Sequence, residues 1–232
     1  MTLKVLSAGA AQGVATAFAE RLRAETGHDL SGTFGAVGMI REKFLGGEPA
    51  DLVILTAAQI ADLVRDGHIV PGSSADLGVV RTGVAVRAGD ALPAIGSAEA
   101  LRASLLAADA IYFPDPERAT AGIHFARVLG SLGIRDAVAA RLRPFPNGAT
   151  AMRELSQAKS ARPIGCTQVT EINNTPGVTL VGVLPREFEL ATTYSLGVSA
   201  RATVPAVARK LAAWLTGPES AALRSRAGFE IR

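Results

Sequence analysis

The chain has 232 residues, of which 48% are hydrophobic and 19% charged, and its formal net charge is +3. A chain of this size can bury a real core, and no apolar run approaches the ~18 residues of a membrane-spanning helix, so we expect no membrane insertion. The basic residues are scattered, which favours a small anionic ligand and argues against nucleic acid. Cys166 is the only cysteine and the three histidines lie far apart, so we expect no disulfide, no metal site and no cofactor.

Strand and helix patterns alternate through the first third of the chain. Val14, Phe18 and Leu22 fall on one face of an expected helix. Such β-α units in series indicate a mainly parallel sheet that helices cover on both faces. The expected elements are strands at residues 3–8, 29–34 and 51–55 and helices at residues 13–25, 37–45 and 57–66.

The alternation continues to the end of the chain. Gly83 interrupts a long strand pattern, and Ser97 is placed to cap a helix. We expect strands at residues 77–86, 111–113 and 190–199, helices at residues 97–108, 120–132, 204–215 and 219–227, and further elements of the series at residues 136–142, 150–156, 164–169 and 178–183.

Two of these strands, near residues 79–86 and 190–199, are long enough to cross between two lobes. This predicts that residues 1–81 and 195–232 form lobe I and that residues 82–194 form lobe II. Sheets of this kind take their ligands at the carboxyl ends of the strands, so we expect a ligand cleft between the lobes.

Four short segments each lie between a strand-like run and a helix-like run. The amino end of a helix carries unpaired N–H groups and about half a positive charge, so it suits an anion. Tight turns alone also explain individual glycines in these segments, and their shared placement is what favours a ligand. The segments are residues 8–13, 34–38, 115–122 and 147–150.

Five stretches in the same order resemble the periplasmic molybdate-binding proteins of ABC transporters. They are residues 5–10, 34–38, 47–54, 115–122 and 227–229, and the third is a Gly-x-Pro-Ala-Asp turn before a buried strand. The resemblance covers almost the whole chain. It implies an α/β, two-lobed fold of the type II periplasmic-binding-protein kind, with two crossing strands and each lobe a mainly parallel sheet flanked by helices.

The departures from that family concern its ligand contacts. In the family, the oxyanion is held by two serine hydroxyls, a tyrosine hydroxyl and backbone N–H groups. The serines fall on Ala10 and Val37 of this sequence, and the tyrosine falls near Gln168. Each missing donor costs a buried oxyanion ~1–3 kcal/mol, so we expect an altered ligand, an organic carboxylate in place of molybdate.

The expected ligand contacts divide between the two lobes. Ala10, Ala11, Val37 and Met39 suggest an apolar ligand body at the first lobe, whereas polar residues suggest an anionic group at the second. The full set of expected ligand-binding residues is Ala10, Ala11, Gln12, Val37, Gly38, Met39, Arg118, Thr120, Ala121, Asn147, Gly148, Gln168 and Tyr194.

The sequence leaves the class of function open, with a binding protein favoured. An isomerase or lyase of an organic acid on the same scaffold is the main alternative, with Asp115, Glu117, His124 and Cys166 as candidate catalytic groups. Each also has a structural explanation, because Asp115 precedes a proline in a turn and Cys166 lies in an apolar strand. A ligand-sensing domain that acts through a partner is a third reading.

The first residues bear on location. Met1-Thr2-Leu3-Lys4 runs directly into an apolar strand without a charged leader or cleavage site, which predicts a cytoplasmic protein for the sequence as written. Had a signal peptide been removed, the protein would be periplasmic and its partner would be an ABC permease.

Overall fold

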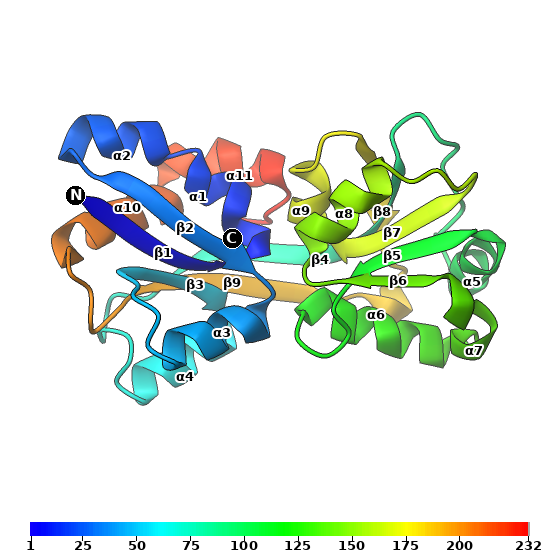
Figure 1. Ribbon diagram of the computed structural model, residues 1–232, viewed down its shortest axis with the longest axis horizontal. Coiled ribbons are helices and arrows are strands. Elements are labelled where there is room, and N and C mark those ends of the chain that lie inside the picture. The colour runs from blue at the N-terminus through cyan, green and yellow to red at the C-terminus, as the bar shows by residue number, and fades with distance from the viewer. Residues whose placement is uncertain (232) are drawn as a thin grey trace. The chain divides into compact units, whose positions relative to one another are not determined.

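The computed structural model describes residues 1–231 and consists of two compact units (Figure 1). Unit 1 comprises Met1–Val80 and the described residues from Thr192 onward, and unit 2 comprises Arg81–Ala191. The chain passes between them twice, once within each of two long strands. No helix in residues 1–231 is both long and apolar enough to cross a membrane.

Unit 1 is built on three parallel strands and one antiparallel strand in the order β2-β1-β3-β9. All four residues from Leu52 to Leu55 of the central strand are fully buried, as expected from the apolar run there. The strands are β1 (Thr2–Ala8), β2 (Asp29–Gly35), β3 (Leu52–Thr56) and β9 (Ala191–Val198). The helices are η1 (Gly9–Ala11), α1 (Gln12–Thr16), α2 (Ala19–Thr26), α3 (Val37–Leu45), α4 (Ala57–Arg65), α10 (Pro205–Thr216), η4 (Pro218–Ser220) and α11 (Ala221–Ala227).

The helix expected at residues 13–25 is in fact two helices, α1 and α2, separated at Ala17 and Phe18. The Thr16 hydroxyl donates to the carbonyl of Gln12, a local bond that competes with regular helix. The break brings Phe18 against Trp214, with ring centroids 6.2 Å apart. Tertiary stacking therefore decides where this helix divides.

Unit 2 has a sheet in the order β4-β7-β5-β6, in which β5, β6 and β7 are parallel and β8 pairs with β4. Gly83 does not interrupt β4, which is continuous from Ala75 to Arg87. The single element expected at residues 136–142 is instead two short helices, α7 and η2, and the start of the short strand β6. The strands are β4 (Ala75–Arg87), β5 (Ala110–Pro114), β6 (Leu142–Phe145), β7 (Pro163–Gln168) and β8 (Val178–Val183). The helices are α5 (Ala98–Ala107), α6 (Thr120–Ser131), α7 (Arg135–Val138), η2 (Ala139–Arg141), α8 (Gly148–Ser156), α9 (Val169–Asn173) and η3 (Arg186–Phe188).

Helices cover both faces of the unit 2 sheet, as the pattern predicted. Ile111 and Phe113 of β5 pack with α5, α6 and α7 in one apolar cluster. The alternate residue, Tyr112, packs against the other cluster, which α8 and α9 complete. The two-residue period of the strand thus sends successive side chains to opposite layers. Figure 1 shows α6 and α8 on opposite sides of β5. The expected mixed α/β architecture, with a mainly parallel sheet between layers of helices, is confirmed.

Candidate functional site

The first candidate region, here called the unit 1 edge, consists of residues 9–12 and 36–39 after β1 and β2. The two strands stay paired up to Ala8 and Gly35, so these segments begin side by side. Neither α1 nor α3 has a side-chain cap, and their N-cap residues are Ala11 and Ala36. At this edge the helix starts therefore present backbone groups without capping hydroxyls.

The residues expected to contact ligand at the unit 1 edge are mostly apolar and buried. Ala10, Ala11 and Val37 are 5%, 0% and 6% exposed, so positions 10 and 37 supply methyl groups where the resembling family has hydroxyls. The remaining expected residues there, Gln12, Gly38 and Met39, are half-buried. The structure places Tyr194 on β9, opposite Thr56 of β3 and away from both loops in sequence, with 1% of its surface exposed.

The second candidate region, here called the unit 2 edge, is the end of the sheet at which β5, β6 and β7 finish and α6, α8 and α9 begin. Pro114 of β5 pairs with Phe145 of β6, so the strands end together. A Cβ on Gly122 would collide with the carbonyl oxygens of Pro114 and Asp115. Glycine at this position lets α6 start directly against the end of β5.

The loop before α6 is shaped by Asp115. Its Oδ1 accepts hydrogen bonds from the backbone N–H groups of Glu117 (2.7 Å) and Arg118 (3.1 Å), an Asx-type turn. The side chains of Glu117 and Arg118 are exposed. α6 then begins at Thr120 without a side-chain cap and without an acidic residue in its first turn. Its positive end, which includes the expected residues Thr120 and Ala121, suits an anion.

The start of α8 differs because its donors are engaged within unit 2. Asn147 Oδ1 accepts from the N–H of Thr150 at 2.8 Å. The N–H groups of Gly148 and Ala149 donate to the carboxyl group of Glu171. An anion at this helix end would have to displace that carboxyl group. The contacts of Asn147 and Gly148 in the structure are therefore contacts within the fold.

Glu171 is buried and was not anticipated from the sequence. Its Oε2 accepts a hydrogen bond from the Thr167 hydroxyl at 2.5 Å, and the backbone N–H of Gln168 also donates to the carboxyl group. Burial raises the pKa of Glu171 above its usual range, and these hydrogen bonds oppose the rise without cancelling it. The available signal was an acidic residue three positions after a strand, in the first turn of the short helix α9.

Gln168 lies at the end of β7 and is 2% exposed, yet neither atom of its carboxamide has a hydrogen-bond partner among residues 1–231. Thr82, its partner across the β4–β7 ladder, is 1% exposed, and its hydroxyl is unpaired in the same sense. Paired residues of adjacent strands point to the same face, so these two polar groups share one surface. Buried polar groups are nearly always bonded, which marks this pair as a place for a polar ligand. Thr82 was missed, although it stands out as a polar residue in an apolar strand.

Two candidate catalytic groups are held in structural contacts. His124 Nε2 lies 2.7 Å from the carbonyl oxygen of Phe188. Cys166 is fully buried, and burial raises the pKa of its thiol, which disfavours the reactive thiolate. Asp115 is engaged in its turn, and Glu117 is exposed on the loop.

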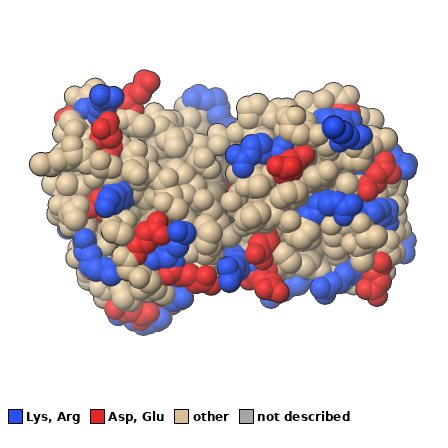
Figure 2. Space-filling view, viewed as in Figure 1, with Lys and Arg blue, Asp and Glu red and all other residues tan. Residues whose placement is uncertain are grey.

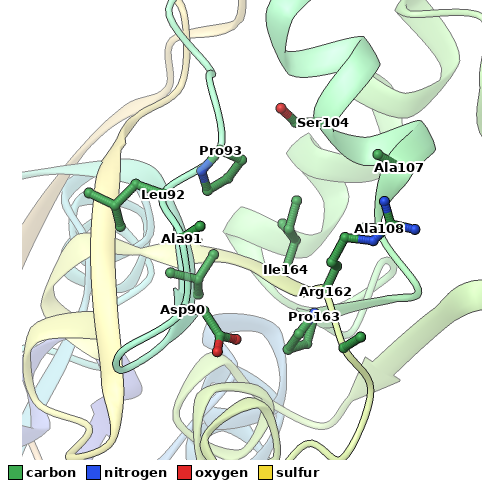
Figure 3. Close-up of a pocket in the computed structure, with 12 residues that line it drawn as sticks. Asp90, Ala91, Leu92, Pro93, Ser104, Ala107, Ala108, Arg162, Pro163 and Ile164 are labelled. Carbon is green, nitrogen blue, oxygen red and sulfur yellow. The ribbon is translucent and has the colours of Figure 1, made fainter.

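A cavity of about 290 Å³ lies elsewhere in unit 2, where β7 begins (Figure 3). Its lining is mainly apolar, with Leu92, Pro93 and Ile164 among the residues shown. Its two charged residues are already paired, Asp90 with Arg87 at 2.9 Å and Arg162 with Asp109 at 3.3 Å. This cavity is therefore less suited to an anion than the unit 2 edge.

The surface charges and the possible metal ligands of the described residues do not mark a further site. Acidic and basic side chains are interspersed over the face shown in Figure 2, without a patch of one sign. Within residues 1–231, no three His, Cys, Asp or Glu residues are grouped so that they could hold a metal ion. The site chemistry described above therefore rests on helix ends and neutral polar groups.

The sequence and the structure are similar to those of known proteins. Aconitate isomerase from a Pseudomonas species is 27% identical over 230 residues, which are 95% of this chain and 84% of that protein. The periplasmic molybdate-binding protein of Azotobacter vinelandii is 19% identical, with a TM-score of 0.79 and 99% of each chain covered. A sulfate-binding protein from Mycobacterium tuberculosis is 17% identical, with a TM-score of 0.74, and the match covers 99% of this chain and 86% of that one.

The match to the Azotobacter vinelandii protein confirms the resemblance to molybdate-binding proteins at the level of the fold, and the sulfate-binding protein shares that fold. A family model described as bacterial extracellular solute-binding protein matches residues 3–230. Since that match spans nearly the whole sequence and both units, the chain belongs to the family of bacterial extracellular solute-binding proteins.

Proposed function

We propose that this solute-binding protein takes a small organic carboxylic acid, and that the unit 2 edge binds its carboxylate. The observation that carries the proposal is the buried carboxamide of Gln168, which lacks a hydrogen-bond partner among the described residues. The positive end of α6 and the Thr82 hydroxyl complete the proposed contacts. Arg118, exposed on the loop before α6, is a further candidate contact.

The chemistry of Gln168 favours an organic acid over a bare oxyanion. A carboxamide has both an NH₂ donor and a carbonyl acceptor. A molybdate or sulfate dianion offers acceptors only, so it would leave the Gln168 carbonyl oxygen unpaired and next to a negative charge. An organic acid with a hydroxyl or a protonated carboxyl group besides its carboxylate satisfies both ends of the amide.

The unit 1 edge supports the same class of ligand. Ala10 and Val37 provide methyl groups where the resembling family has serine hydroxyls, and both are buried. These two side chains suit the carbon skeleton of an organic acid and offer no hydrogen-bond donor to a fully oxygenated anion. As part of the proposal, the protein works outside the cytoplasm and delivers its ligand to an ABC permease, in keeping with the extracellular description of its family.

A thermal unfolding screen tests the proposal. The purified protein is melted with aliphatic and aromatic carboxylates, including di- and tricarboxylates, and separately with molybdate, tungstate, sulfate and phosphate. A ligand at a hundred times its Kd adds about 2.7 kcal/mol, which corresponds to a shift of roughly 5–10 °C in a chain of this size. A shift with molybdate or tungstate and none with any carboxylate would refute the proposal.

The variant Gln168→Leu sharpens the screen. It removes an unpaired buried amide, so we expect the unliganded protein to melt at the same temperature or higher. We expect the carboxylate-induced shift to disappear. Gln157→Leu, which alters an exposed glutamine after α8, is the matched control and should keep the shift.

An isomerase of an organic acid is a second candidate, and the similarity to aconitate isomerase over 95% of this chain favours it. Aconitate is an unsaturated tricarboxylic acid, so this activity is compatible with the proposed ligand class. Proton NMR of the protein with cis- or trans-aconitate distinguishes the two functions. Interconversion at a rate proportional to protein concentration indicates an enzyme, and a thermal shift without interconversion indicates a binding protein.

A further inference from the structure

The N-terminus of α8 is filled by groups of the chain itself. The N–H groups of Gly148 and Ala149 face the Glu171 carboxyl group, and that of Thr150 is capped by Asn147. A Cβ on Gly148 would overlap Glu171 Oε2 and Thr167 Oγ1, so the side chain of Glu171 lies directly against the helix start. A helix of nine residues thus begins at a strand end with its anion-binding position already taken.

The N-terminus of α6 belongs to the same sheet edge but has neither a side-chain cap nor an acidic residue in its first turn. The orphaned amide of Gln168 immediately follows Thr167, whose hydroxyl donates to Glu171. The carboxyl group of Glu171 and the unpaired groups of Gln168 therefore belong to one short segment, the turn from β7 into α9. Because successive residues of a strand point to opposite faces, Thr167 and Glu171 lie on the side of α8, and the Gln168 side chain lies on the side of α6.

We infer that Glu171 determines specificity: its carboxyl group takes the place of an anionic ligand at α8, so the unit 2 edge accepts one carboxylate near α6 and rejects tetrahedral dianions. The inference rests on the proposed function and explains why the site would select a carboxylate over a tetrahedral dianion. A tetrahedral dianion needs donors on several sides and finds those of α8 already taken by Glu171, whereas a single carboxylate needs only the donors near α6.

Sulfate binding to Glu171→Gln tests the inference, because sulfate stays a dianion throughout the accessible pH range. We expect isothermal titration calorimetry at pH 7 to give sulfate affinity at least about tenfold higher for this variant than for the wild type. Glu171→Asp retains the charge and should show no gain. Glu154→Gln removes the same charge from an exposed position on α8 and should also leave the affinity unchanged.

The location of the bound anion is read from backbone amide NMR shifts. In Glu171→Gln, sulfate should move the amide signals of Gly148 and Ala149, whereas in the wild type these two signals should stay fixed. A folded Glu171→Gln variant with unchanged sulfate affinity would overturn the inference. So would wild-type signals of Gly148 and Ala149 that move with millimolar sulfate, and this measurement serves even if the variant does not fold.

The two proposals fail separately. If the wild type binds no carboxylate while Glu171→Gln gains sulfate binding at Gly148, the assignment of the organic acid is wrong and the role of Glu171 stands. If carboxylates bind through Gln168 and the Glu171 variant gains nothing, the proposed function stands and the selectivity has another origin.

Discussion

Each unit holds a buried carboxyl group against the start of a helix, and the two groups differ in their electrostatic state. In unit 1, Asp51 accepts from the N–H groups of Lys4 (2.8 Å), Thr203 (2.6 Å) and Val204 (3.1 Å), at the beginning of α10. Burial raises its pKa, but these bonds outweigh burial and hold the pKa below the usual range. In unit 2, burial outweighs the bonds to Glu171 and its pKa is raised.

The difference lies in the balance between burial and hydrogen bonding. Asp51 is stabilised as an anion by donors from β1 and from the segment before α10, which fixes distant parts of unit 1 together. The hydrogen bonds to Glu171 do not offset its burial, so its ionised form is disfavoured in the folded protein. Similar contacts thus stabilise the carboxylate in one unit and leave its ionisation unfavourable in the other.

The largest expected effect comes from changing Gly148. In Gly148→Ala the new Cβ would overlap the side chains of Glu171 and Thr167, so we expect a loss of more than about 3 kcal/mol in the free energy of unfolding. Urea unfolding followed by circular dichroism measures it. Gly130→Ala on α6, where nothing lies within 4 Å, is the control and should stabilise by about 0.5–1 kcal/mol. Equal effects of the two substitutions would contradict the tight contact at α8.

Asp51→Asn should have the next largest effect. The amide presents an NH₂ group to N–H donors that now find a carboxylate, and we expect a cost of about 2–3 kcal/mol. Asp62→Asn, at a 43% exposed side chain of α4 that is ion-paired with Arg65, should change the free energy of unfolding by less than about 0.5 kcal/mol. A similarly small change in the free energy of unfolding for Asp51→Asn would contradict the structural role of Asp51.

The pH dependence of stability should have opposite sign for the two carboxyl groups. Because the pKa of Asp51 is lower in the folded protein, its stabilisation is present above the unfolded pKa and is lost as pH falls through the folded pKa. Because the pKa of Glu171 is raised, its contribution is present below the unfolded pKa and is lost as pH rises through the folded pKa. Urea midpoints between pH 3 and pH 8 measure both.

Two variants show which carboxyl group causes each change of stability with pH. The stability of Glu171→Gln relative to the wild type should increase with rising pH, and that of Asp51→Asn should increase with falling pH. If Glu171→Gln shows the same pH profile as the wild type, the Glu171 carboxyl group does not titrate as its burial implies.

The smallest expected effect concerns the unit 1 edge. Ala10→Ser together with Val37→Ser returns hydroxyls to two positions at which the resembling family has serine. For this double variant we expect molybdate affinity to rise by about 0.5–1.5 kcal/mol for each hydroxyl that bonds the ligand. Calorimetric titration checks this, with Ala10→Val and Val37→Thr as separate size and hydroxyl controls. No gain in the double serine variant would show that these positions do not contact the anion.

The sequence supports the fold more firmly than the site. A continuous apolar run predicted β3, and the alternating strand and helix signals predicted α3. The predicted cap at Ser97 is also present, since its hydroxyl accepts from the Ala100 N–H at 3.2 Å. The prediction of one continuous helix at residues 13–25 was wrong. The break between α1 and α2 brings Phe18 against Trp214, a residue almost two hundred positions away. Local patterns contain no term for such a contact.

Site residues follow the same division. Gln168 was selected because the ligand-binding tyrosine of the resembling family falls near it, and the structure adds that its amide lacks a partner among the described residues. Thr82 and Glu171 were missed, since their relevance arises from strand pairing and from a contact with Gly148 that only the folded chain creates. The ligand-binding roles of these residues stay predictions that the experiments above address.

The path of the chain also has a consequence for biosynthesis. Unit 2 is one continuous segment, Arg81–Ala191, whereas unit 1 needs β9, α10 and α11 from beyond it. On the ribosome, unit 2 can finish folding while β3 still lacks its neighbour β9. The newly made N-terminal segment must therefore wait with an exposed strand edge until the last residues emerge, a period in which a holding chaperone would protect it from aggregation.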